Sequence, residues 1–450
     1  MSYPVYSEYG ALLSASGFAY PVTWPIERLR FSILSNPVRS EVAHWKDDEL
    51  VSFVPMEAIG EQGGIDASQE KPIGDVYTGY TYFSEQDILV AKITPCFENG
   101  KGAIATGLKN GIGFGTTEFH VLRPLQHIST TWLFYLTMSD AFRKIGGSEM
   151  LGAGGQKRVQ EDFIKNFQTG IPPFTEQQKI GTFLDWKTVQ IDALIAKKKE
   201  LMDKLKEKRL AVITQAVTKG LDPAAPLRDS GIPWLGDVPV HWEVKRLKFV
   251  ARIGNGSTPN REDPSYWDDG VYPWLNSSVV NRETVTSADQ FVTPLALKEC
   301  HLPRIQPPAV LVGITGQGRT RGMASTLLFD ATINQHLAYV KPDPSHAAVG
   351  FLRRVFDMAY SHLRSESENG GSTKGAITCE QIAELPIPVP PLAEQTFIAA
   401  YVDAAINKIN KMAEKTESAV SHLTEYRTAL ITAATTGKID VRHVAIPAPT

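Results

Sequence analysis

The sequence predicts a mixed α/β (α+β) fold in which two globular domains are joined by two long antiparallel coiled-coil helices, with a pseudo-twofold internal repeat. Three observations support this prediction. The same motifs recur at a fixed offset, long apolar stripes with steps of three and four residues follow each copy of one motif, and short apolar runs bounded by turn residues occupy the segments between them. A fixed period constrains the architecture of the whole chain more strongly than any single element does.

The repeat relates two tryptophans and a Pro-Pro-x-x-Glu-Gln motif. The separation between Trp24 and Trp242 is the same as that between the motif copies at 172–177 and 390–395, and we call it the repeat offset. Between these anchors, residues 32–150 and 250–370 share only scattered likeness. Each unit is therefore expected to be a variable body followed by a constant tail. A stretch rich in Pro and Gly, 220–233, is typical of a turn or linker between the units.

Both constant tails are predicted to be helices, over residues 175–218 and 393–435. Their apolar residues follow the spacing of a coiled-coil seam, and Gly220 and Gly437 mark the helix ends. The stripes could instead belong to two amphipathic helices in unrelated cores, but their equal length and register favour mutual pairing. The expected seam residues are Ile180, Leu184, Ile191, Leu194, Leu201, Leu205 and Val212, with Ile398, Val402, Ala405, Ile409, Met412, Ala419, Leu423, Tyr426 and Leu430 in the second helix.

The variable bodies are predicted to mix strands and helices. Short apolar runs bounded by turn residues indicate strands, and longer segments with helical spacing indicate helices. The expected strands are 87–93, 118–123, 309–314 and 336–340, and the expected helices are 132–143 and 350–363. No strand order follows from these patterns.

Length and composition bound the remaining possibilities. A chain of 450 residues suggests two to four domains. It contains no stretch near the roughly 20 apolar residues of a membrane helix and no basic leader followed by an apolar run, so no membrane partner and a cytoplasmic location are expected. Cys96, Cys300 and Cys379 are far apart and form no CxxC pair, which argues against a disulfide framework and a structural zinc site.

The formal net charge is −3. That charge excludes a protein that coats nucleic acid by bulk positive charge, because non-specific affinity comes mainly from Lys and Arg that neutralise phosphates. Any DNA binding by this chain must therefore use local basic patches or charge contributed by partner proteins.

Motifs of catalysis are missing from the sequence. It has no Asn-Pro-Pro-aromatic motif of an adenine methyltransferase, no phosphate-binding Gly-Lys-Ser/Thr loop and no His-Glu-x-x-His. The Gly-rich stretches 254–256 and 316–322 have the wrong spacing for a dinucleotide loop. The sequence therefore predicts no catalytic residue, no metal ligand and no cofactor bound by this chain.

Several segments resemble Type I restriction-modification specificity subunits. The tails, beginning at 171–180 and 389–395, are similar to the central and C-terminal conserved regions of that family, and 256–274, with Tyr266-Trp267 and Pro273-Trp274, resembles the opening of its target recognition domains. The first body carries a different variant, in 93–101 and 115–119. The resemblance covers residues 20–443 and implies four segments: 1–170 and 223–388 with the two target recognition domains, and 171–222 and 389–450 with the conserved helices.

The resemblance also implies a mechanism. Each body would read one half of a split, asymmetric site on double-stranded DNA, and the helices would hold the bodies at a fixed separation. Two methyltransferase subunits would flank this chain and supply S-adenosylmethionine and the adenine chemistry, and restriction (translocase) subunits would join them. Because the partners would contribute positive charge, the resemblance is compatible with a net charge of −3.

Polar residues in Gly-rich loops are the candidate DNA contacts, because Arg and Lys suit guanine, while Asn and Gln suit adenine. In the first body they are Lys92, Thr94, Asn99, Lys101, Thr116, Thr117, Gln156, Lys157 and Arg158. In the second body they are Ser257, Thr258, Asn276, Ser277, Gln317, Arg319, Arg321, Ser372, Thr373 and Lys374.

The repeated motif at the start of each tail is the candidate contact for the methyltransferase subunits, because it repeats almost unchanged although the bodies do not. The residues concerned are Pro172, Pro173, Glu176, Gln177 and Ile180, with Pro390, Pro391, Glu394, Gln395 and Ile398 in the second copy. Two other functions stay open at this point. One is a coiled-coil scaffold without DNA specificity, and the other is a self-contained DNA-modifying enzyme, which the missing motifs disfavour.

Overall fold

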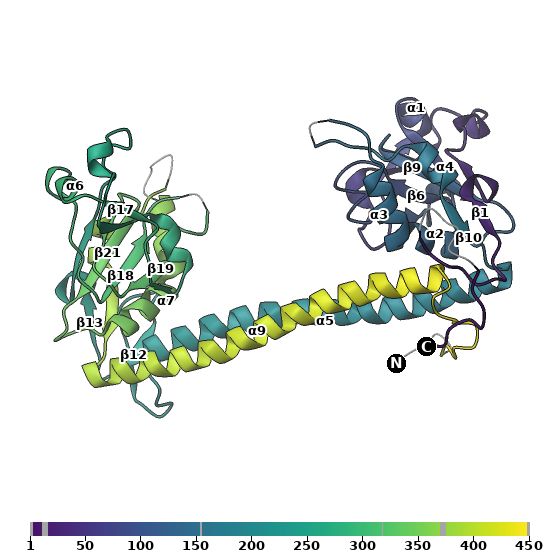
Figure 1. The fold of residues 1–450 in the computed structure, drawn as a ribbon. Helices are drawn as coiled ribbons and strands as arrows, with labels where there is room; N and C mark the ends of the chain where they lie inside the picture. The colour runs from purple at the N-terminus through teal and green to yellow at the C-terminus, as the bar shows by residue number, and fades with distance from the viewer. Residues whose placement is uncertain (1–2, 11–16, 154, 317, 370–374, 448–450) are drawn as a thin grey trace. The chain divides into compact units, whose positions relative to one another are not determined.

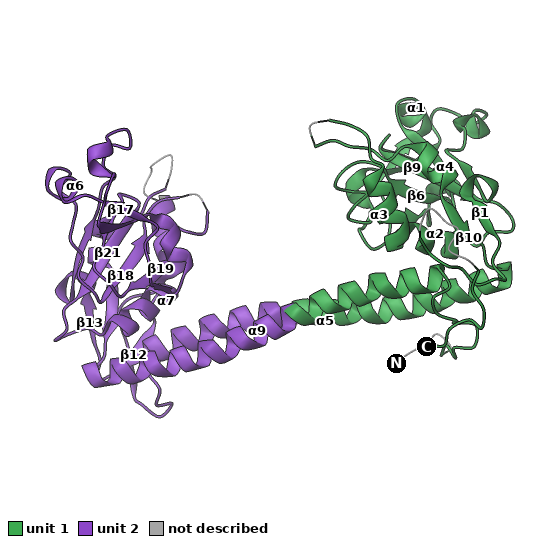
Figure 2. Cartoon of the chain, viewed as in Figure 1, with its two compact units in different colours: residues 1–199, 418–450 green, residues 200–417 purple. Residues whose placement is uncertain are grey.

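A computed structural model describes residues 3–10, 17–153, 155–316, 318–369 and 375–447 (Figure 1). The chain divides into two compact units, which Figure 2 colours separately. Unit 1 comprises residues 1–199 and 418–450, and unit 2 comprises residues 200–417. Each unit combines one body with parts of both long helices.

Unit 1 contains two four-stranded sheets. The first has the order β2 (Ile33–Ser35), β9 (Phe119–Pro124), β6 (Ile88–Ala91), β7 (Gly102–Ile104), and the second has the order β4 (Glu70–Pro72), β3 (Leu50–Val54), β8 (Ile112–Gly115), β5 (Thr81–Ser84). Strands β3 and β8 are parallel, and the other pairs are antiparallel. A further pair joins β1 (Ile26–Arg28) to β10 (Gln168–Gly170).

Strand β6 is buried on both faces, which explains its unbroken apolar sequence. Its side chains alternate between two cores. Ile88 and Val90 pack in the core that holds the helices, whereas Leu89 packs with Phe83 and Phe119 in a second core. The helices of this body are α1 (Ile73–Val76), α2 (Thr130–Met138), α3 (Asp140–Ser148) and α4 (Glu161–Asn166).

The single helix predicted over 132–143 is wrong, because the segment forms α2 and α3, which meet at Ser139. The Ser139 side chain accepts a hydrogen bond from the Phe142 backbone N–H and therefore caps a new helix. A serine within an apolar periodic stretch was the available signal for this break.

Unit 2 contains a five-stranded sheet with the order β14 (Ala251–Asn255), β21 (Leu337–Pro342), β18 (Ala309–Gly313), β19 (Ala324–Leu327), β16 (Thr284–Val285). A three-stranded sheet has the order β17 (Gln290–Val292), β15 (Tyr272–Leu275), β20 (Thr332–Ile333). Two antiparallel pairs join β13 (Glu243–Arg246) to β22 (Pro386–Val389) and β11 (Leu227–Asp229) to β12 (Asp237–Pro239). The helices are α6 (Pro294–Glu299), α7 (Val349–Asn369) and α8 (Cys379–Glu384).

Strand β18 repeats the two-core arrangement of β6. Val310 and Val312 pack with Phe351 and Val355 of α7, whereas Leu311 packs with Leu275 on the other face of the sheet. Short 3-10 helices complete the two bodies: η1 (Leu29–Phe31), η2 (Arg39–Val42), η3 (Met56–Ala58), η4 (Lys109–Gly111), η5 (Leu247–Phe249), η6 (Pro264–Tyr266) and η7 (Ser277–Asn281).

The repeat offset extends into the framework of the bodies, which the sequence comparison left as scattered likeness. Strand β9 begins at Phe119 and β21 at Leu337, β10 begins at Gln168 and β22 at Pro386, and α4 begins at Glu161 and α8 at Cys379. The fold therefore repeats even where the side chains do not.

Two long helices, α5 (Phe174–Lys219) and α9 (Leu392–Thr435), have 46 and 44 residues and confirm the predicted tails to within a residue at either end. In unit 1, Ile191 and Ile195 of α5 pack in one core with Leu430 and Ile431 of α9. In unit 2, the end of α5 packs with the beginning of α9, from Ile398 to Ile406. The pairing is therefore antiparallel, and the fold class predicted from the sequence is confirmed.

The phase of the predicted seam is wrong at every second position. Leu194, Leu201, Met412 and Tyr426 are each at least 38% exposed. The buried residues are instead Ile195, Ile406 and Arg427, which follow the predicted seam positions Leu194, Ala405 and Tyr426. The predicted and observed seams share positions such as Ile191, Leu205 and Ile409. From each shared position the next seam residue lies four residues on, whereas the prediction placed it three residues on. Adjacent apolar residues, as in Leu194-Ile195, fit either phase.

Candidate nucleic-acid interface

One edge of the first body gathers polar residues from three separate segments. Strand β6 ends at Ala91 opposite Phe119, so Lys92 follows it directly, and the Lys92 backbone N–H donates to the Glu118 carbonyl at 2.9 Å. The Val159 N–H donates to the Lys92 carbonyl at 2.9 Å, and the Thr94 N–H donates to the Lys157 carbonyl at 3.0 Å. Segments 92–94, 116–118 and 156–158 therefore meet, and we call this the unit 1 edge.

Seven of the nine sequence-predicted residues of the first body lie at this edge: Lys92, Thr94, Thr116, Thr117, Gln156, Lys157 and Arg158. Gln156, Lys157 and Thr117 are exposed, while the others are partly buried. Among the residues that the structure describes, neither Lys92 nor Lys157 has an ion pair. These two ammonium groups are therefore free to bind an external acceptor.

Arg158 has a partner within the chain. Its guanidinium donates to both Glu118 carboxylate oxygens at 2.9 Å. The hydrogen bond from Arg158 holds the pKa of Glu118 below its usual value against the opposing effect of burial, and Lys92 adds to the lowering. Arg158 would have to leave Glu118 before it read a base directly, so its nearer role is to hold segment 156–158 against segment 116–118.

His120 lies beneath the unit 1 edge, and the sequence analysis did not select it. It is 5% exposed, and its Nε2 lies 2.9 Å from the Val159 carbonyl oxygen. Burial lowers the pKa of His120, so the ring stays neutral and donates its Nε2 hydrogen to that carbonyl. His120 therefore ties β9 to Val159, the residue that follows segment 156–158.

Asn99 and Lys101 lie apart from the other seven candidates. The Asn99 amide donates to Glu61 Oε1 at 3.1 Å, and Lys101 Nζ donates to the Met56 carbonyl at 3.1 Å. The two side chains therefore tie the loop after β6 to η3 and to the segment that follows it. The buried Arg143 fixes the same loop from inside, since its Nη1 donates to the Phe97 carbonyl at 2.9 Å.

The equivalent edge of the second body joins the ends of β14, β15 and β18 to the beginning of β21. The Asn334 N–H donates to the Leu275 carbonyl at 3.0 Å, and the Ile314 N–H donates to the His336 carbonyl at 3.0 Å. Segments 256–258, 275–277, 314–316 and 334–336 therefore meet, and we call this the unit 2 edge. The sequence-predicted Ser257, Thr258, Asn276 and Ser277 belong to it.

Side-chain contacts order the unit 2 edge. Thr258 donates to Gln335 Oε1 at 2.5 Å, and Thr315 Oγ1 lies 2.7 Å from His336 Nδ1. Asn276 accepts a hydrogen bond from the Ser278 N–H at 2.9 Å, which leaves its amide NH2 without a partner among the described residues. Gln335 is exposed and likewise keeps its NH2 free. The edge therefore presents two amide donors.

Gln335 and His336 were missed in the sequence analysis although the repeat marks them. They are the residues that the repeat offset relates to Thr117 and Glu118. Extending the offset from the tails into the bodies would have found them.

The remaining candidates of the second body have other surroundings. Arg321 is 5% exposed and donates to the Gly375 carbonyl and to Glu368 Oε1, both at 2.6 Å. Its guanidinium is therefore bound within the chain. Arg319 is exposed. Gln317, Ser372, Thr373 and Lys374 lie outside the described residues.

The repeated Pro-Pro-x-x-Glu-Gln motif fastens each body to its helix. Trp24 Nε1 donates to Glu176 Oε1 at 3.2 Å, and Trp242 Nε1 donates to Glu394 Oε1 at 3.1 Å. This tryptophan and glutamate pair therefore recurs at the repeat offset with the same geometry.

The glutamine of the motif makes three hydrogen bonds in each copy. Gln177 accepts from the Ser129 N–H at 2.8 Å and donates to the carbonyls of His127 and Pro172. Gln395 makes the same set with Ala348, His346 and Pro390. Each amide thereby joins the residue just before a body helix to the first proline of the motif, which precedes the long helix.

Most candidate partner contacts are consequently buried within this chain. Glu176, Gln177, Gln395, Ile180 and Ile398 are at most 5% exposed. Pro172 and Pro390 are also buried, whereas Pro173 and Pro391 are exposed and Glu394 is intermediate. The two copies of this motif therefore make the same contacts between a body and its long helix. Its role toward a partner protein stays a prediction.

Within the described residues, no group of three or more His, Cys, Asp or Glu side chains is placed to hold a metal ion. The three cysteines are free thiols, and burial raises the pKa of Cys300 and Cys379. No helix in the described part of the chain is long and apolar enough to cross a membrane.

A family model for the Type I restriction modification DNA specificity domain matches the chain twice, at residues 55–207 and 239–419. The chain is 48% identical over 138 residues to the specificity subunit of the Type I restriction enzyme EcoAI from Escherichia coli. The matched segment covers 30% of this chain and 23% of that relative. The EcoEI specificity subunit from Escherichia coli is 44% identical over 140 residues, covering 30% and 24%. These matches span about a quarter of each relative's length.

A longer match has lower identity. A putative Type I restriction enzyme MjaX specificity subunit from Methanocaldococcus jannaschii is 23% identical over 359 residues, 79% of each chain. Among solved structures, a chain of a type I R-M system superposes with a TM-score of 0.74 at 19% identity, covering 93% of this chain and 99% of that one. The HsdS subunit from Thermoanaerobacter tengcongensis superposes with a TM-score of 0.57 at 18% identity, covering 93% and 98%. At such identities the superpositions show a shared fold.

Proposed function

Because this chain belongs to the Type I restriction modification DNA specificity family, we propose that it selects the DNA sequence on which a Type I restriction-modification enzyme acts. The proposal is that the two bodies read the two halves of a split, asymmetric site. The chain itself would carry no catalytic centre, and two methyltransferase subunits would supply S-adenosylmethionine and the transfer of the methyl group to adenine. Restriction subunits would join the same assembly.

The duplicated polar edge is the observation that supports this function. Both edges form where framework strands at equivalent positions end, and both present polar side chains that lack a partner in the described chain. The unit 1 edge offers the ammonium groups of Lys92 and Lys157, which suit acceptors such as guanine O6 and N7. The unit 2 edge offers the amides of Asn276 and Gln335, which suit adenine. Because the two sets differ, the half-sites should be unrelated in sequence.

Point variants at the edges test this proposal. The chain would be expressed with its methyltransferase subunit in a methylation-free host, and methylated adenines would be mapped across the genome. Gln335→Ala should relax or change base preference in one half of the motif only, with a loss of about 1–3 kcal/mol in discrimination, which is typical of one bidentate base contact. Lys157→Ala should act only on the other half.

Two matched controls separate reading from folding. Gln306→Ala changes an exposed amide just before β18, at the other end of that strand from the unit 2 edge, and Lys144→Ala changes an exposed ammonium group on α3, in the same body as Lys157. Neither should alter the motif. If edge variants and controls all left the motif unchanged while the assembly methylated DNA, the edges would not be the readers and a scaffold function would gain support.

A further inference from the structure

A cavity of about 410 Å³ lies in unit 2, beside the end of β18. Four arginines line it, namely Arg209 of α5, Arg282 after η7, Arg319 and Arg353 of α7, together with the carboxylates of Glu283 and Asp357. Phe356, Tyr360 and Met323 supply apolar wall. Its volume is within the range of pockets that hold small ligands.

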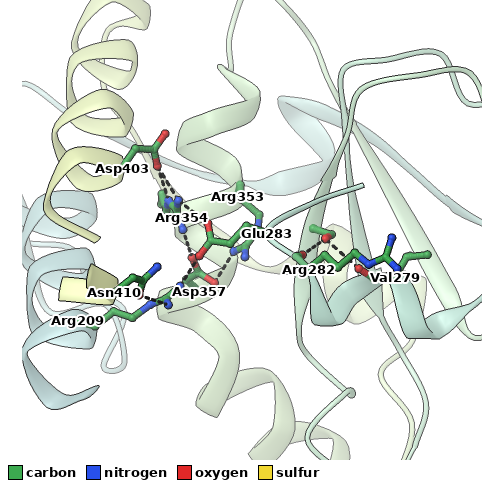
Figure 3. Close-up of polar contacts among 10 residues, drawn as sticks. Arg209, Val279, Arg282, Glu283, Arg353, Arg354, Asp357, Asp403 and Asn410 are labelled. Atoms are coloured by element: carbon green, nitrogen blue, oxygen red, sulfur yellow. Dashed lines mark hydrogen bonds and ion pairs between the residues drawn. The ribbon is translucent and has the colours of Figure 1, made fainter. Parts of the chain in front are cut away.

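The two carboxylates already have cationic partners (Figure 3). Glu283 binds Arg209 Nη2 at 2.5 Å and Arg354 Nη2 at 2.8 Å. Asp357 pairs with Arg353 and, at 2.8 Å, with Arg354. Burial works to raise the pKa of Glu283, but the hydrogen bond from Arg354 and the charges of Arg353 and Arg209 lower it overall, so this carboxylate stays ionised.

Positive charge remains after these pairs are counted. Arg282 and Arg319 have no carboxylate partner among the described residues, and the ion pairs in Figure 3 do not include Arg282. Arg353 is 7% exposed, and its Nε hydrogen has no acceptor within the described chain. A buried donor without an acceptor costs free energy, and an anion in the cavity would remove that cost.

Packing of the body on the helices does not require this arginine set. In unit 1, Arg427 is the equivalent of Arg209 at the repeat offset and binds Asp192, as Arg209 binds the equivalent Asn410. There, however, Arg427 meets the Gln62 carbonyl instead of a glutamate. The Asp185 carboxylate, equivalent to Asp403, accepts from the Tyr135 hydroxyl, whereas Asp403 binds Arg354. The same attachment is therefore made without an arginine-lined cavity.

We propose that this cavity binds a phosphate group, and that in the assembly the group belongs to the DNA backbone. Arginine is well suited to phosphate because its planar fork donates two parallel hydrogen bonds. With a net charge of −3, the phosphate contacts that the chain itself makes are expected in local patches of this kind. The DNA source rests on the function proposed above, while the phosphate site itself rests on the cavity.

The test compares the full chain with its double variant Arg282→Gln/Arg319→Gln, each assembled with the methyltransferase subunit for the DNA measurements. The matched control is Arg252→Gln, which removes the same charge from an exposed position on β14, at the opposite end of the five-stranded sheet from the cavity. Two probes are used: a duplex DNA that carries the methylated motif, with binding followed by fluorescence anisotropy at several salt concentrations, and inorganic pyrophosphate, followed by calorimetry.

The proposal assigns Arg319, which the sequence offered as a candidate base contact, to phosphate instead. For DNA, the slope of log Kobs against log salt should therefore become shallower by about 1 for each cavity arginine removed, with the methylated motif unchanged because phosphate contacts position DNA without reading sequence. Arg252→Gln should leave the slope as in the unaltered chain. Pyrophosphate should bind the unaltered chain and the control, and the double variant should lose that binding.

The arms also separate the possible sources. Pyrophosphate binding that depends on Arg282 and Arg319, with an unchanged DNA slope, would keep the phosphate site but overturn its assignment to DNA. No pyrophosphate binding together with an unchanged DNA slope would overturn the site. An unaltered chain that bound no DNA in its assembly would instead contradict the proposed function, and the pyrophosphate arm would still decide the cavity.

Discussion

At the scale of single residues, the motif glutamines show how a repeated sequence can arise from packing. Gln177 was selected from the sequence as a partner contact, but it is 1% exposed and bonds three backbone groups of its own chain. The sequence showed that the residue matters twice, yet it could not show why. Repetition of a motif alone does not tell whether its residues contact a partner protein or stabilise the fold of their own chain.

Replacing Gln177 with alanine should destabilise the chain. The change leaves the Ser129 N–H and two carbonyls without partners in a buried site, so we expect a loss of about 1–3 kcal/mol in the free energy of unfolding. Gln178→Ala, one residue away on the same helix and exposed, is the matched control and should change stability by less than about 0.5 kcal/mol. Urea unfolding followed by circular dichroism measures both. Equal unfolding midpoints for Gln177→Ala and Gln178→Ala would contradict a stabilising role for Gln177.

A second residue-scale prediction concerns pH. The pKa of His120 is lowered by burial, so between this lowered value and the ordinary value near 6.5 the unfolded chain binds more protons than the folded chain. Stability should therefore fall as pH decreases below about 6.5. His120→Gln removes this titration, and its unfolding midpoint should change less than that of the unaltered chain between pH 7 and pH 5.5.

His422→Gln serves as the control for that measurement, because it makes the same substitution at an exposed position on α9. If His120→Gln and His422→Gln had the same pH dependence as the unaltered chain, the neutral buried state of His120 would be wrong.

At the scale of elements, the sequence predicted which long helices form and where they end better than it predicted which of their faces is buried. The double prolines and terminal glycines located α5 and α9 to within a residue, since these residues act locally on the backbone. The seam phase and the break at Ser139 depend on what packs against each face, which a single sequence does not display. The candidate site shows the same division: the sequence selected segments that the structure brings together, but it did not show that Glu118 and Glu368 bind Arg158 and Arg321.

The seam phase predicts a contrast between neighbours. Ile195→Ala removes a side chain that is 7% exposed, so we expect a loss of about 2–5 kcal/mol in the free energy of unfolding. Leu194→Ala removes a side chain that is 44% exposed and should cost less than about 1 kcal/mol. Thermal or urea unfolding of the two variants compares them directly. Equal losses would restore the phase predicted from the sequence.

At the scale of the whole molecule, the sequence hypothesis that helix length fixes the spacer between half-sites stays a prediction. Both α5 and α9 are continuous through the boundary between the units. Deleting one heptad from each helix would preserve the seam and shorten each by about 10 Å, or about three base pairs. We expect such a variant either to lose activity or to methylate a motif with a shorter spacer and unchanged half-sites. An active variant with the original spacer would contradict the hypothesis.

The central claim, that this chain chooses DNA sequence through two independent bodies, is tested most directly by exchanging residues 32–150 for the equivalent body of another family member and mapping methylated adenines by long-read sequencing. The framework that surrounds this segment, from β1 and β10 to the motif at 172–177, would stay in place to receive the new body. The account predicts a motif in which one half changes and the other half is retained. A change in both halves would contradict the independence of the bodies, and an unchanged motif would contradict DNA reading by this chain.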